Sequence, residues 1–277
     1  MDMLYPVSVV TPSGISADDV WQMLLQARED AGLRSHLFHL QAPPSAAAQE
    51  LLSIYLPFFH KRQRRPTVIA HLAQSLDGRI ALPDGASQWI SGPEDLDHTH
   101  RLRALADAVL VGAGTVAADN PRLTVRRVAG RNPLRVVVDP QRRLSGDERL
   151  FSDDAAPTLL LCDEERWDAG ETCGAADVVG VPMRDGVLDI LSILDALGQR
   201  GVERLLIEGG GVTVSHFLAA GCLDRLHLVV APVLMGAGRP SICLPSIPSL
   251  DEAIRPDMRF FSLGQDVLFD CWFSEAR

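Results

Sequence analysis

The sequence predicts an α/β fold in which a largely parallel sheet carries helices on both faces. Two patterns predict it: short runs rich in β-forming residues recur between residues 67 and 233, and helical patterns lie between several of these runs. Strands that alternate with helices are typical of a parallel sheet covered on both sides. The chain has 277 residues, of which 47% are hydrophobic and 22% charged, as is usual for a globular protein.

An N-terminal piece of different character precedes this region. Residues 1–65 show two helical patterns, at 20–33 and 45–55, and end in a basic hinge. Pro66 follows the hinge and resists continuation of a helix. We therefore expect a small helical extension of unknown role at 1–65 and a main domain at 66–277.

The elements of the main domain follow in chain order. Six strands are expected, at 67–73, 108–111, 135–139, 158–162, 205–207 and 226–233. Three helices are expected, at 93–107, 187–199 and 213–220. The last stretch, 258–273, places hydrophobic residues at alternate positions and predicts an added antiparallel strand.

Charge and cysteine content narrow the class of protein. A net charge of −10 and a pI near 5.2 argue against nucleic acid as a partner. No apolar run approaches the ~20 residues that a membrane span needs, so no membrane association is expected. Five cysteines are scattered singly without a C-x-x-C pair, which argues against a disulfide framework and against a metal site. A reducing cytoplasm is the expected location.

Two glycine-rich segments indicate a nucleotide. The first reads G-A-G-T-V-A at 112–117, directly after a predicted strand, and fits the dinucleotide pattern G-x-G-x-x-A. Asn120 and Pro121 leave room for barely two helical turns, so a standard Rossmann unit fits badly. The second reads E-G-G-G at 208–211. Three consecutive glycines are costly in backbone entropy, so close approach of a pyrophosphate to their amides explains them better than a plain turn.

Two single polar residues leave alternatives open. Arg103 lies on a partly apolar helix face, where an arginine either snorkels or binds an anion. His71 interrupts an apolar run and is either a hydrogen-bonded core histidine or a proton donor.

Five segments, taken in order, resemble one family. They read S-L-D-G-R-I-A, G-A-S-Q-W-I, G-A-G-T-V-A-A-D-N-P-R-L-T-V-R, R-V-V-V-D and I-E-G-G-G. The set is similar to the pyrimidine reductase domain of riboflavin biosynthesis, whose fold is like that of dihydrofolate reductase. The resemblance covers about residues 66–275. Bifunctional members carry a deaminase domain before the reductase, but residues 1–65 are too short and lack a zinc motif, so a stand-alone reductase is expected.

The resemblance implies an activity. NADPH would reduce the ribose of 5-amino-6-(5-phosphoribosylamino)uracil to an open-chain ribityl group, with hydride delivered to C1′. The partner is then a small phosphorylated pyrimidine, and family resemblance adds a homodimer. Such a reaction needs a held nicotinamide, a clamp on the sugar phosphate and a proton donor.

The resemblance also assigns residues. The expected catalytic residues are Glu208, His71 and Asp119, of which His71 is expected from its own chemistry and not from the family pattern. The implied substrate-binding residues are Ser87, Arg103, Leu123, Arg126 and Glu208, with the two arginines suited to phosphate. The implied cofactor-binding residues are Ala73, Trp89, Thr115, Asp119, Pro140, Gly210, Gly211, Val212, Thr213, Val214, Ser215 and His216. Arg142 or Arg143 would approach the adenosine 2′-phosphate and favour NADP over NAD.

Two positions depart from the family. His71 stands where the family often has lysine, and Ala86 stands where it has an acidic residue. These departures keep two other functions open. One is NADPH-dependent reduction of a pterin or a related aminopyrimidine. The other is a relative that binds nucleotide without catalysis, which the retention of Arg103, Arg126 and Glu208 disfavours.

Overall fold

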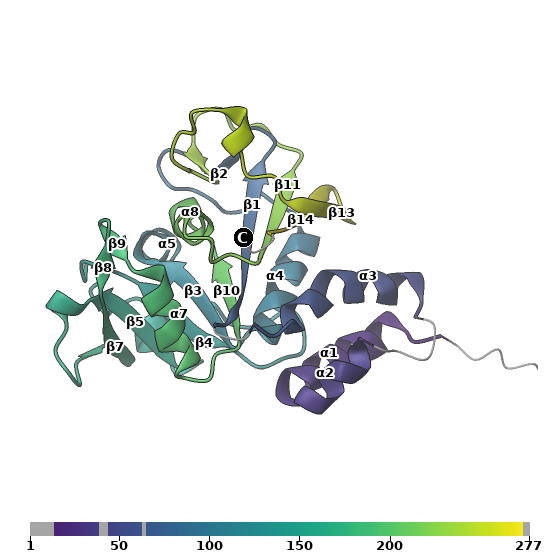
Figure 1. The fold of residues 1–277 in the computed structure, drawn as a ribbon, viewed down its shortest axis with the longest axis horizontal. Helices are drawn as coiled ribbons and strands as arrows, with labels where there is room; N and C mark the ends of the chain where they lie inside the picture. The colour runs from purple at the N-terminus through teal and green to yellow at the C-terminus, as the bar shows by residue number, and fades with distance from the viewer. Residues whose placement is uncertain (1–13, 39–43, 63–64, 274–277) are drawn as a thin grey trace, which may run out of the picture. The chain divides into compact units, whose positions relative to one another are not determined.

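The computed structural model describes residues 14–38, 44–62 and 65–273 of the chain. It divides into two compact units, Met1–Phe59 and His60–Arg277 (Figure 1). Within the described residues, no helix is both long enough and apolar enough to cross a membrane.

The first unit consists of short helices. The expected helix at 20–33 is in fact two, α1 (Ala17–Glu29) and α2 (Ala31–Leu37). They separate at Asp30, whose extended backbone ends α1 while its carboxylate accepts a hydrogen bond from the Gly32 amide at 2.7 Å. The other expected helix is present as α3 (Ala46–Tyr55), followed by the 3₁₀ turn η1 (Leu56–Phe59).

The second unit is built on a ten-stranded sheet with the order β13-β14-β11-β1-β10-β3-β4-β5-β7-β6. The six expected strands are all present, as β1 (Thr67–Ser75), β3 (Ala108–Gly112), β4 (Leu134–Val138), β5 (Thr158–Asp163), β10 (Arg204–Glu208) and β11 (Arg225–Ala231). They run parallel to one another, so the predicted largely parallel sheet is confirmed.

The edges of the sheet differ from the sequence prediction. The C-terminal stretch forms a hairpin of β13 (Asp257–Leu263) and β14 (Asp266–Trp272) instead of one strand, because Gly264 adopts a φ of +66° and reverses the chain. At the other edge, β7 (Ala176–Val181) and β6 (Thr172–Cys173) were not expected. Two further short pairs are β2 (Arg79–Ala81) with β12 (Arg239–Pro240), and β8 (Met183–Arg184) with β9 (Val187–Leu188).

Helices cover both faces of this sheet. The three expected helices are α4 (Pro93–Leu105), α7 (Ile190–Gly198) and α8 (Gly211–Ala219), and shorter elements are α5 (Ala113–Asp119), α6 (Arg149–Ser152), η2 (Glu164–Arg166) and η3 (Leu250–Glu252). Alternate residues of β1 point to opposite faces: Ala70 and Leu72 join the apolar core with α7 and α8, whereas His71 points toward α4. One face of the sheet at β1 is therefore apolar, and the other face carries polar side chains.

The start of α4 places one side chain differently from what an S-G-P-E sequence suggests. Gly92, not Ser91, is the N-cap, and Pro93 takes the first helical position. The Ser91 hydroxyl instead donates to the Asp95 carboxylate at 2.5 Å. Asp95 is thereby held at the first turn of the helix.

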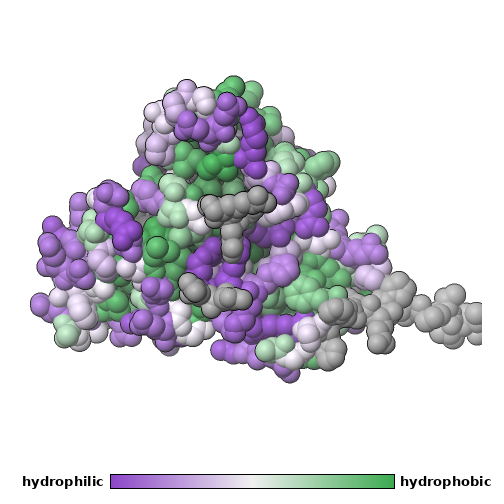
Figure 2. Space-filling view, viewed as in Figure 1, coloured by the Kyte–Doolittle hydropathy of each residue, from purple (hydrophilic) through white to green (hydrophobic). Residues whose placement is uncertain are grey.

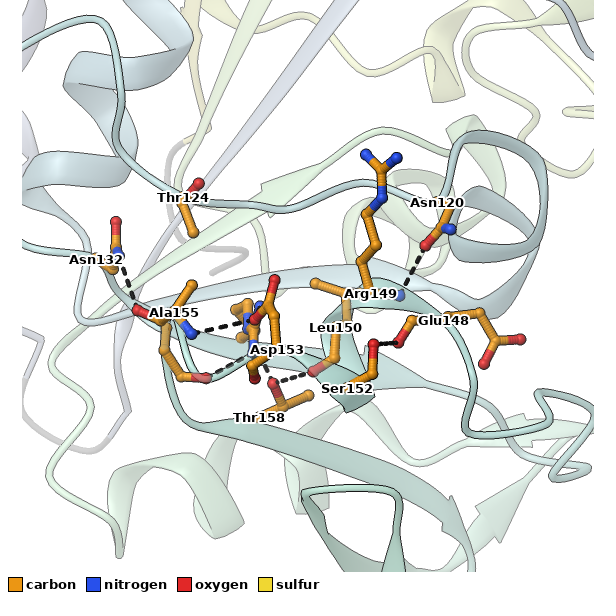
Figure 3. A network of polar contacts seen from close by, with 12 residues as sticks. Asn120, Thr124, Asn132, Glu148, Arg149, Leu150, Ser152, Asp153, Ala155 and Thr158 are labelled. Carbon is orange, nitrogen blue, oxygen red and sulfur yellow. Dashed lines mark hydrogen bonds and ion pairs between the residues drawn. The ribbon is translucent and has the colours of Figure 1, made fainter.

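A polar network fixes the segment between α5 and β4 (Figure 3). Asn120 accepts a hydrogen bond from the Arg149 amide at 2.9 Å, and Asn132 donates to the Ala155 carbonyl at 2.9 Å. The Thr158 hydroxyl donates to the Leu150 carbonyl at 2.7 Å. Residues 120–132, which include two of the expected substrate contacts, are thus tied at both ends to the region of α6.

Candidate active site

A cleft of about 760 Å³ opens at the carboxyl ends of the central parallel strands. β3 and β10 contribute their last residues to it, β1 contributes residues 71–73, and α5 and α8 begin there. Hydrophobic surface is exposed in the region of α7 and α8 (Figure 2). This end of an open α/β sheet is where ligands bind, because loops and helix starts converge there.

Most of the expected site residues line this cleft. They are His71, Ala73, Ser87, Trp89, Thr115, Asp119, Pro140, Glu208, Gly210, Gly211, Val212, Thr213 and His216. Segments far apart in the sequence are therefore brought to one place. Ser87 and Asp119, expected on the substrate and cofactor sides respectively, meet directly through a hydrogen bond of 3.1 Å from the serine hydroxyl to the carboxylate.

The two glycine-rich segments face each other across one part of the cleft. Gly209 and Gly210 have φ values of +58° and +64°. A Cβ on Gly210 would lie 2.9 Å from the Thr115 hydroxyl oxygen, and one on Gly112 would lie 2.7 Å from that of Thr213. The positive φ favours glycine at 209 and 210, and an added Cβ at Gly112 or Gly210 would press on a threonine hydroxyl. Neither α5 nor α8 has a side-chain cap at its start, so the first backbone amides of both helices can meet a ligand.

Helical periodicity places some residues of the segment 211–216 at the cleft and buries the others in the protein. Val214 and Ser215 turn into the protein and do not line the cleft, whereas Gly211, Val212, Thr213 and His216 do. The Ser215 hydroxyl donates to the Gly211 carbonyl at 2.6 Å and accepts from the Cys243 amide at 2.9 Å. The role of Ser215 here is to join α8 to the segment that follows β12.

That following segment packs very closely on α8. A Cβ on Gly211 would overlap the Ser241 carbonyl oxygen, at 1.8 Å. The Ser241 amide donates to the Gly78 carbonyl at 3.1 Å, and its hydroxyl donates to Gln74 at 2.5 Å. The segment around Ser241, in one wall of the cleft, is therefore hydrogen-bonded to the end of β1 and the turn after it, and it packs against the start of α8.

The expected substrate contacts form a polar cluster beside and behind Glu208. Arg103 donates to both carboxylate oxygens of Glu208 at 2.6 Å, and its third nitrogen donates to the Thr124 carbonyl at 3.1 Å. Glu208 lines the cleft, but Arg103, Leu123 and Arg126 do not. Separate contacts of Arg103 and Glu208 with the substrate were expected, whereas in the structure the two side chains pair with each other.

Arg126 lies close to this pair. Its guanidinium donates to the Thr124 hydroxyl at 2.6 Å, and its amide donates to the His100 ring at 2.9 Å. Burial, with the nearby charges of Arg103 and Arg122, lowers the pKa of Arg126. Several positive charges gathered with one carboxylate favour an anion, and a sugar phosphate would relieve their repulsion.

Two expected site residues have unusual backbones. Trp89 has a φ of +67° with 82% of its surface exposed at the cleft, and Leu123 has a φ of +53° although it is buried. Bulky residues at positive φ are strained and are found preferentially at functional sites. The strain supports both residues as parts of a site.

The two arginines after β4 differ in position. Arg143 lines the cleft, whereas Arg142 pairs with Glu171 at 2.8 Å and does not line it. Of the two residues that the sequence left open, Arg143 is therefore the one placed to meet a ligand in the cleft.

His71 is joined by a residue that sequence analysis missed. Its Nε2 lies 2.8 Å from Asp95 Oδ1, and both side chains are buried at the cleft wall. Burial acts against a charge on His71, but Asp95 and Glu208 together outweigh it and raise the pKa of His71. The sequence did contain a signal for Asp95: it lies eight residues before Arg103, on the same side of the predicted helix. Thr99, Arg239 and Cys243 also line the cleft and were not expected.

Comparison with known proteins gives a consistent result. Residues 66–267 match the model of the RibD C-terminal domain family. The 2,5-diamino-6-ribosylamino-4(3H)-pyrimidinone 5′-phosphate reductase of Methanothermobacter thermautotrophicus is 40% identical over 217 residues, which are 74% of this chain and 97% of that protein. Riboflavin biosynthesis protein RibD of Aquifex aeolicus is 33% identical over 213 residues, 76% of this chain and 59% of that protein.

Comparison with solved structures finds the same fold. A diaminohydroxyphosphoribosylaminopyrimidine deaminase/5-amino-6-(5-phosphoribosylamino)uracil reductase from Thermotoga maritima superposes with a TM-score of 0.63 at 27% identity, covering 87% of this chain and 66% of that one. RibD of Acinetobacter baumannii shows the same fold with a TM-score of 0.66 at 24% identity, covering 82% of this chain and 62% of that one. This chain therefore spans less than two thirds of these longer relatives and nearly the whole of the Methanothermobacter protein.

Proposed function

Because this chain belongs to the RibD C-terminal domain family, we propose that it is an NADPH-dependent reductase of riboflavin biosynthesis. Its substrate is 5-amino-6-(5-phosphoribosylamino)uracil, whose ribose becomes a ribityl group. The observation that carries the proposal is the convergence of Glu208, His71 and two facing glycine segments in one cleft. A binding module has no need of a buried Arg–Glu pair and a buried His–Asp pair side by side in the wall of its cleft.

A second pyrimidine is favoured by the comparisons. The relatives from Methanothermobacter and Archaeoglobus are named for a 2,5-diamino-pyrimidinone, which carries an amino group where the uracil has an oxygen. The two compounds share the ribosylamino phosphate and differ at position 2 of the ring. Both are therefore substrates to test, and the sugar chemistry is the same for each.

The residues present fit a dinucleotide cofactor. At Gly209 and Gly210 an added Cβ would lie 3.2 and 2.9 Å from the Thr115 side chain, so this cradle is tight, and the uncapped start of α8 offers backbone amides to a pyrophosphate. Thr115 and Thr213 flank this cradle, and Trp89 offers an exposed ring. Arg143 offers positive charge for a 2′-phosphate, which favours NADPH over NADH. When bound, the cofactor supplies the hydride.

The remaining residues act on the substrate. Arg126, with Arg103 behind it, attracts the sugar phosphate, and Glu208 accepts hydrogen bonds from pyrimidine or ribityl donors. Ser87 and Asp119, which both line the cleft, are joined by a hydrogen bond. His71 supplies the proton that opening of the sugar ring requires.

The domain organisation and assembly follow from the same proposal. The reductase domain is proposed for residues 66–277, of which 66–267 match the family model, and the residues before it are an N-terminal extension of unknown role. The reductase acts as a cytoplasmic homodimer and needs neither metal nor nucleic acid.

The test is oxidation of NADPH by the purified protein, followed at 340 nm, with each of the two pyrimidines and with a dihydropterin. Turnover of either pyrimidine, with the ribityl product identified by mass spectrometry, supports the proposal. Turnover of the dihydropterin alone would assign the cleft to pterin reduction instead. Binding of NADPH without turnover of any of the three would indicate a non-catalytic relative.

Arg126→Ala separates these outcomes further. Loss of the guanidinium should raise KM for a phosphorylated pyrimidine at least tenfold, because a charge-assisted contact to phosphate is lost. It should leave the KM of an unphosphorylated pterin unchanged. An unchanged KM for the pyrimidine would remove Arg126 from the phosphate site.

A further inference from the structure

Polar side chains form a row across four neighbouring strands. In the strand register, Glu208 on β10 is paired with His71 on β1, His71 with His227 on β11, and His227 with Asp270 on β14. Residues paired in this way point to the same face of a sheet. This row lies on the face that α4 covers, because Arg103, Asp95 and His98 of α4 contact its members.

The Asp95 carboxylate is held at both oxygens. Oδ1 lies 2.8 Å from His71 Nε2, and Oδ2 accepts the Ser91 hydroxyl at 2.5 Å. Burial alone would raise the pKa of Asp95, but His71 and Ser91 lower it, so the group stays a carboxylate. With Nε2 directed at Asp95, Nδ1 is the ring nitrogen of His71 that is left for a ligand in the cleft.

Two further histidines lie behind His71. The His98 ring meets His71 edge to face, with centroids 5.5 Å apart, and stacks on His227 with centroids 5.1 Å apart. His98 Nε2 lies 3.1 Å from His227 Nδ1, and His227 Nε2 lies 3.4 Å from Asp270 Oδ1. Asp270 in turn is paired with Arg225.

The charges around the row differ from one histidine to the next. His71 faces Asp95 and Glu208, which favour its protonation, and Arg103, which opposes it. His98 faces His227, His71 and Arg101, and burial together with these groups holds the pKa of His98 well below its usual range.

His227 differs from His71 although each has a carboxylate beside it. Burial lowers the pKa of His227, and Arg225 and His71 add to this lowering against the attraction of Asp270. Positive charge is therefore best held at the cleft end of the row, on His71.

We propose that Asp95 is a positioning residue that orients His71 and keeps its ring protonated, so that His71 Nδ1 delivers the proton to the sugar ring oxygen. This inference rests on the proposed function. The Nδ1–H bond breaks and an O–H bond forms as the bond from C1′ to the ring oxygen breaks, which leaves an open-chain iminium between C1′ and the amino nitrogen. C1′ then accepts the hydride, and neutral His71 regains its proton from solvent after the product leaves. The substrate gains one hydride and one proton in total, so charge and atoms balance.

The first test needs neither substrate nor turnover. Titration of the histidine-labelled protein by NMR, with the His71 signal identified from its loss in His71→Asn, should show His71 titrating above pH 6.5. His98 and His227 should remain neutral throughout that titration. A His71 that titrates below pH 6 in the unaltered protein would overturn the inference without any variant of Asp95.

The second test uses a matched pair of variants on α4. Asp95→Asn should move the His71 titration to lower pH, and should reduce kcat at least tenfold at pH 8 but less than threefold at pH 5.5, because low pH restores the proton. Asp97→Asn, two residues along the same helix in an exposed pair with Arg127, should change neither. Equal loss of kcat at both pH values in Asp95→Asn would reduce Asp95 to a structural role.

These readouts separate two failures. If the unaltered protein reduces neither pyrimidine, the proposed function falls, and the NMR titration alone decides whether Asp95 charges His71. If the protein reduces a pyrimidine but the His71 titration is the same in Asp95→Asn, the function stands and the inference is wrong.

Discussion

Arg103 and Glu208 form a two-pronged ion pair beside the cleft, with Nε and Nη2 of the arginine each 2.6 Å from one carboxylate oxygen. They come from α4 and β10, 105 residues apart. Because both nitrogens are used, the carboxylate of Glu208, which lines the cleft, is fixed in orientation. The cleft is thereby given a carboxylate whose orientation is set before any ligand binds.

Glu208→Gln should therefore impair the reaction more than cofactor binding. The amide keeps the size of the side chain but loses the charge and one acceptor, so we expect kcat/KM to fall at least tenfold. The Kd for NADPH, measured by fluorescence titration, should stay within about twofold because the glycine cradle is untouched. An unchanged kcat/KM would place Glu208 outside the site.

Gly210→Ala should weaken NADPH binding strongly. The added Cβ would lie 2.9 Å from the Thr115 hydroxyl oxygen, inside the cradle proposed for the pyrophosphate. Gly221→Ala is the matched control, because Gly221 has the same φ of +64° but no atom within 4 Å of an added Cβ. Both variants should lose similar stability from the positive φ, about 1 kcal/mol. Only Gly210→Ala should raise the Kd for NADPH, by at least tenfold, and equal Kd values would argue against the cradle.

Arg143→Ala should reduce the preference for NADPH over NADH. Removal of the charge at the cleft costs the interaction with a 2′-phosphate, so KM for NADPH should rise about tenfold while KM for NADH stays constant. Arg142→Ala, which breaks only the pair with Glu171, should leave the ratio of the two KM values unchanged. A change of that ratio in Arg142→Ala alone would reverse the assignment.

Asp270 should contribute to stability in a pH-dependent way. It is completely buried, and the hydrogen bond from Arg225 with the neighbouring His227 lowers the pKa of Asp270 to about 2 against the effect of burial. A carboxyl group whose pKa is lower in the folded state stabilises the fold above its unfolded pKa of 3.8, and this contribution disappears as pH falls from about 4 toward 2.

The corresponding variant is Asp270→Asn. It leaves Arg225 without its buried partner and should reduce the free energy of unfolding by about 3 kcal/mol at pH 7, measured by urea denaturation. Asp97→Asn, which breaks an exposed pair, should cost less than about 1 kcal/mol. Equal losses in the two variants would show that the Asp270 cluster contributes nothing beyond an ordinary surface pair.

The sequence predicted the central strands because their signal is local. Runs such as 108–111 are apolar and short, and this one is bounded by Asp107 and Gly112, so a strand can be predicted from the run itself. The sequence signal for the hairpin at the edge of the sheet was weaker, since Gly264 alone marks the turn between β13 and β14. The early break at Asp30 was missed because α1 and α2 continue one apolar pattern across it.

The site was predictable where glycines mark close approach, as at 208–211, and where motifs resemble a family. Pairings between distant residues have no local signal, which is why the Arg103–Glu208 pair was not foreseen. Asp95 was overlooked because an acidic residue in the first turn of a helix usually needs no further explanation than the helix dipole. Only the fold shows that this carboxylate faces His71.

Cys243 places an accessible thiol in the cleft, where it can be labelled. It lines the cleft and is the exposed member of the five cysteines, whereas the other four are buried. A maleimide fluorophore should therefore attach at one position, next to the cleft wall that packs against α8. The label would turn occupancy of the cleft into an optical signal, so that ligands could be screened before any substrate is synthesised.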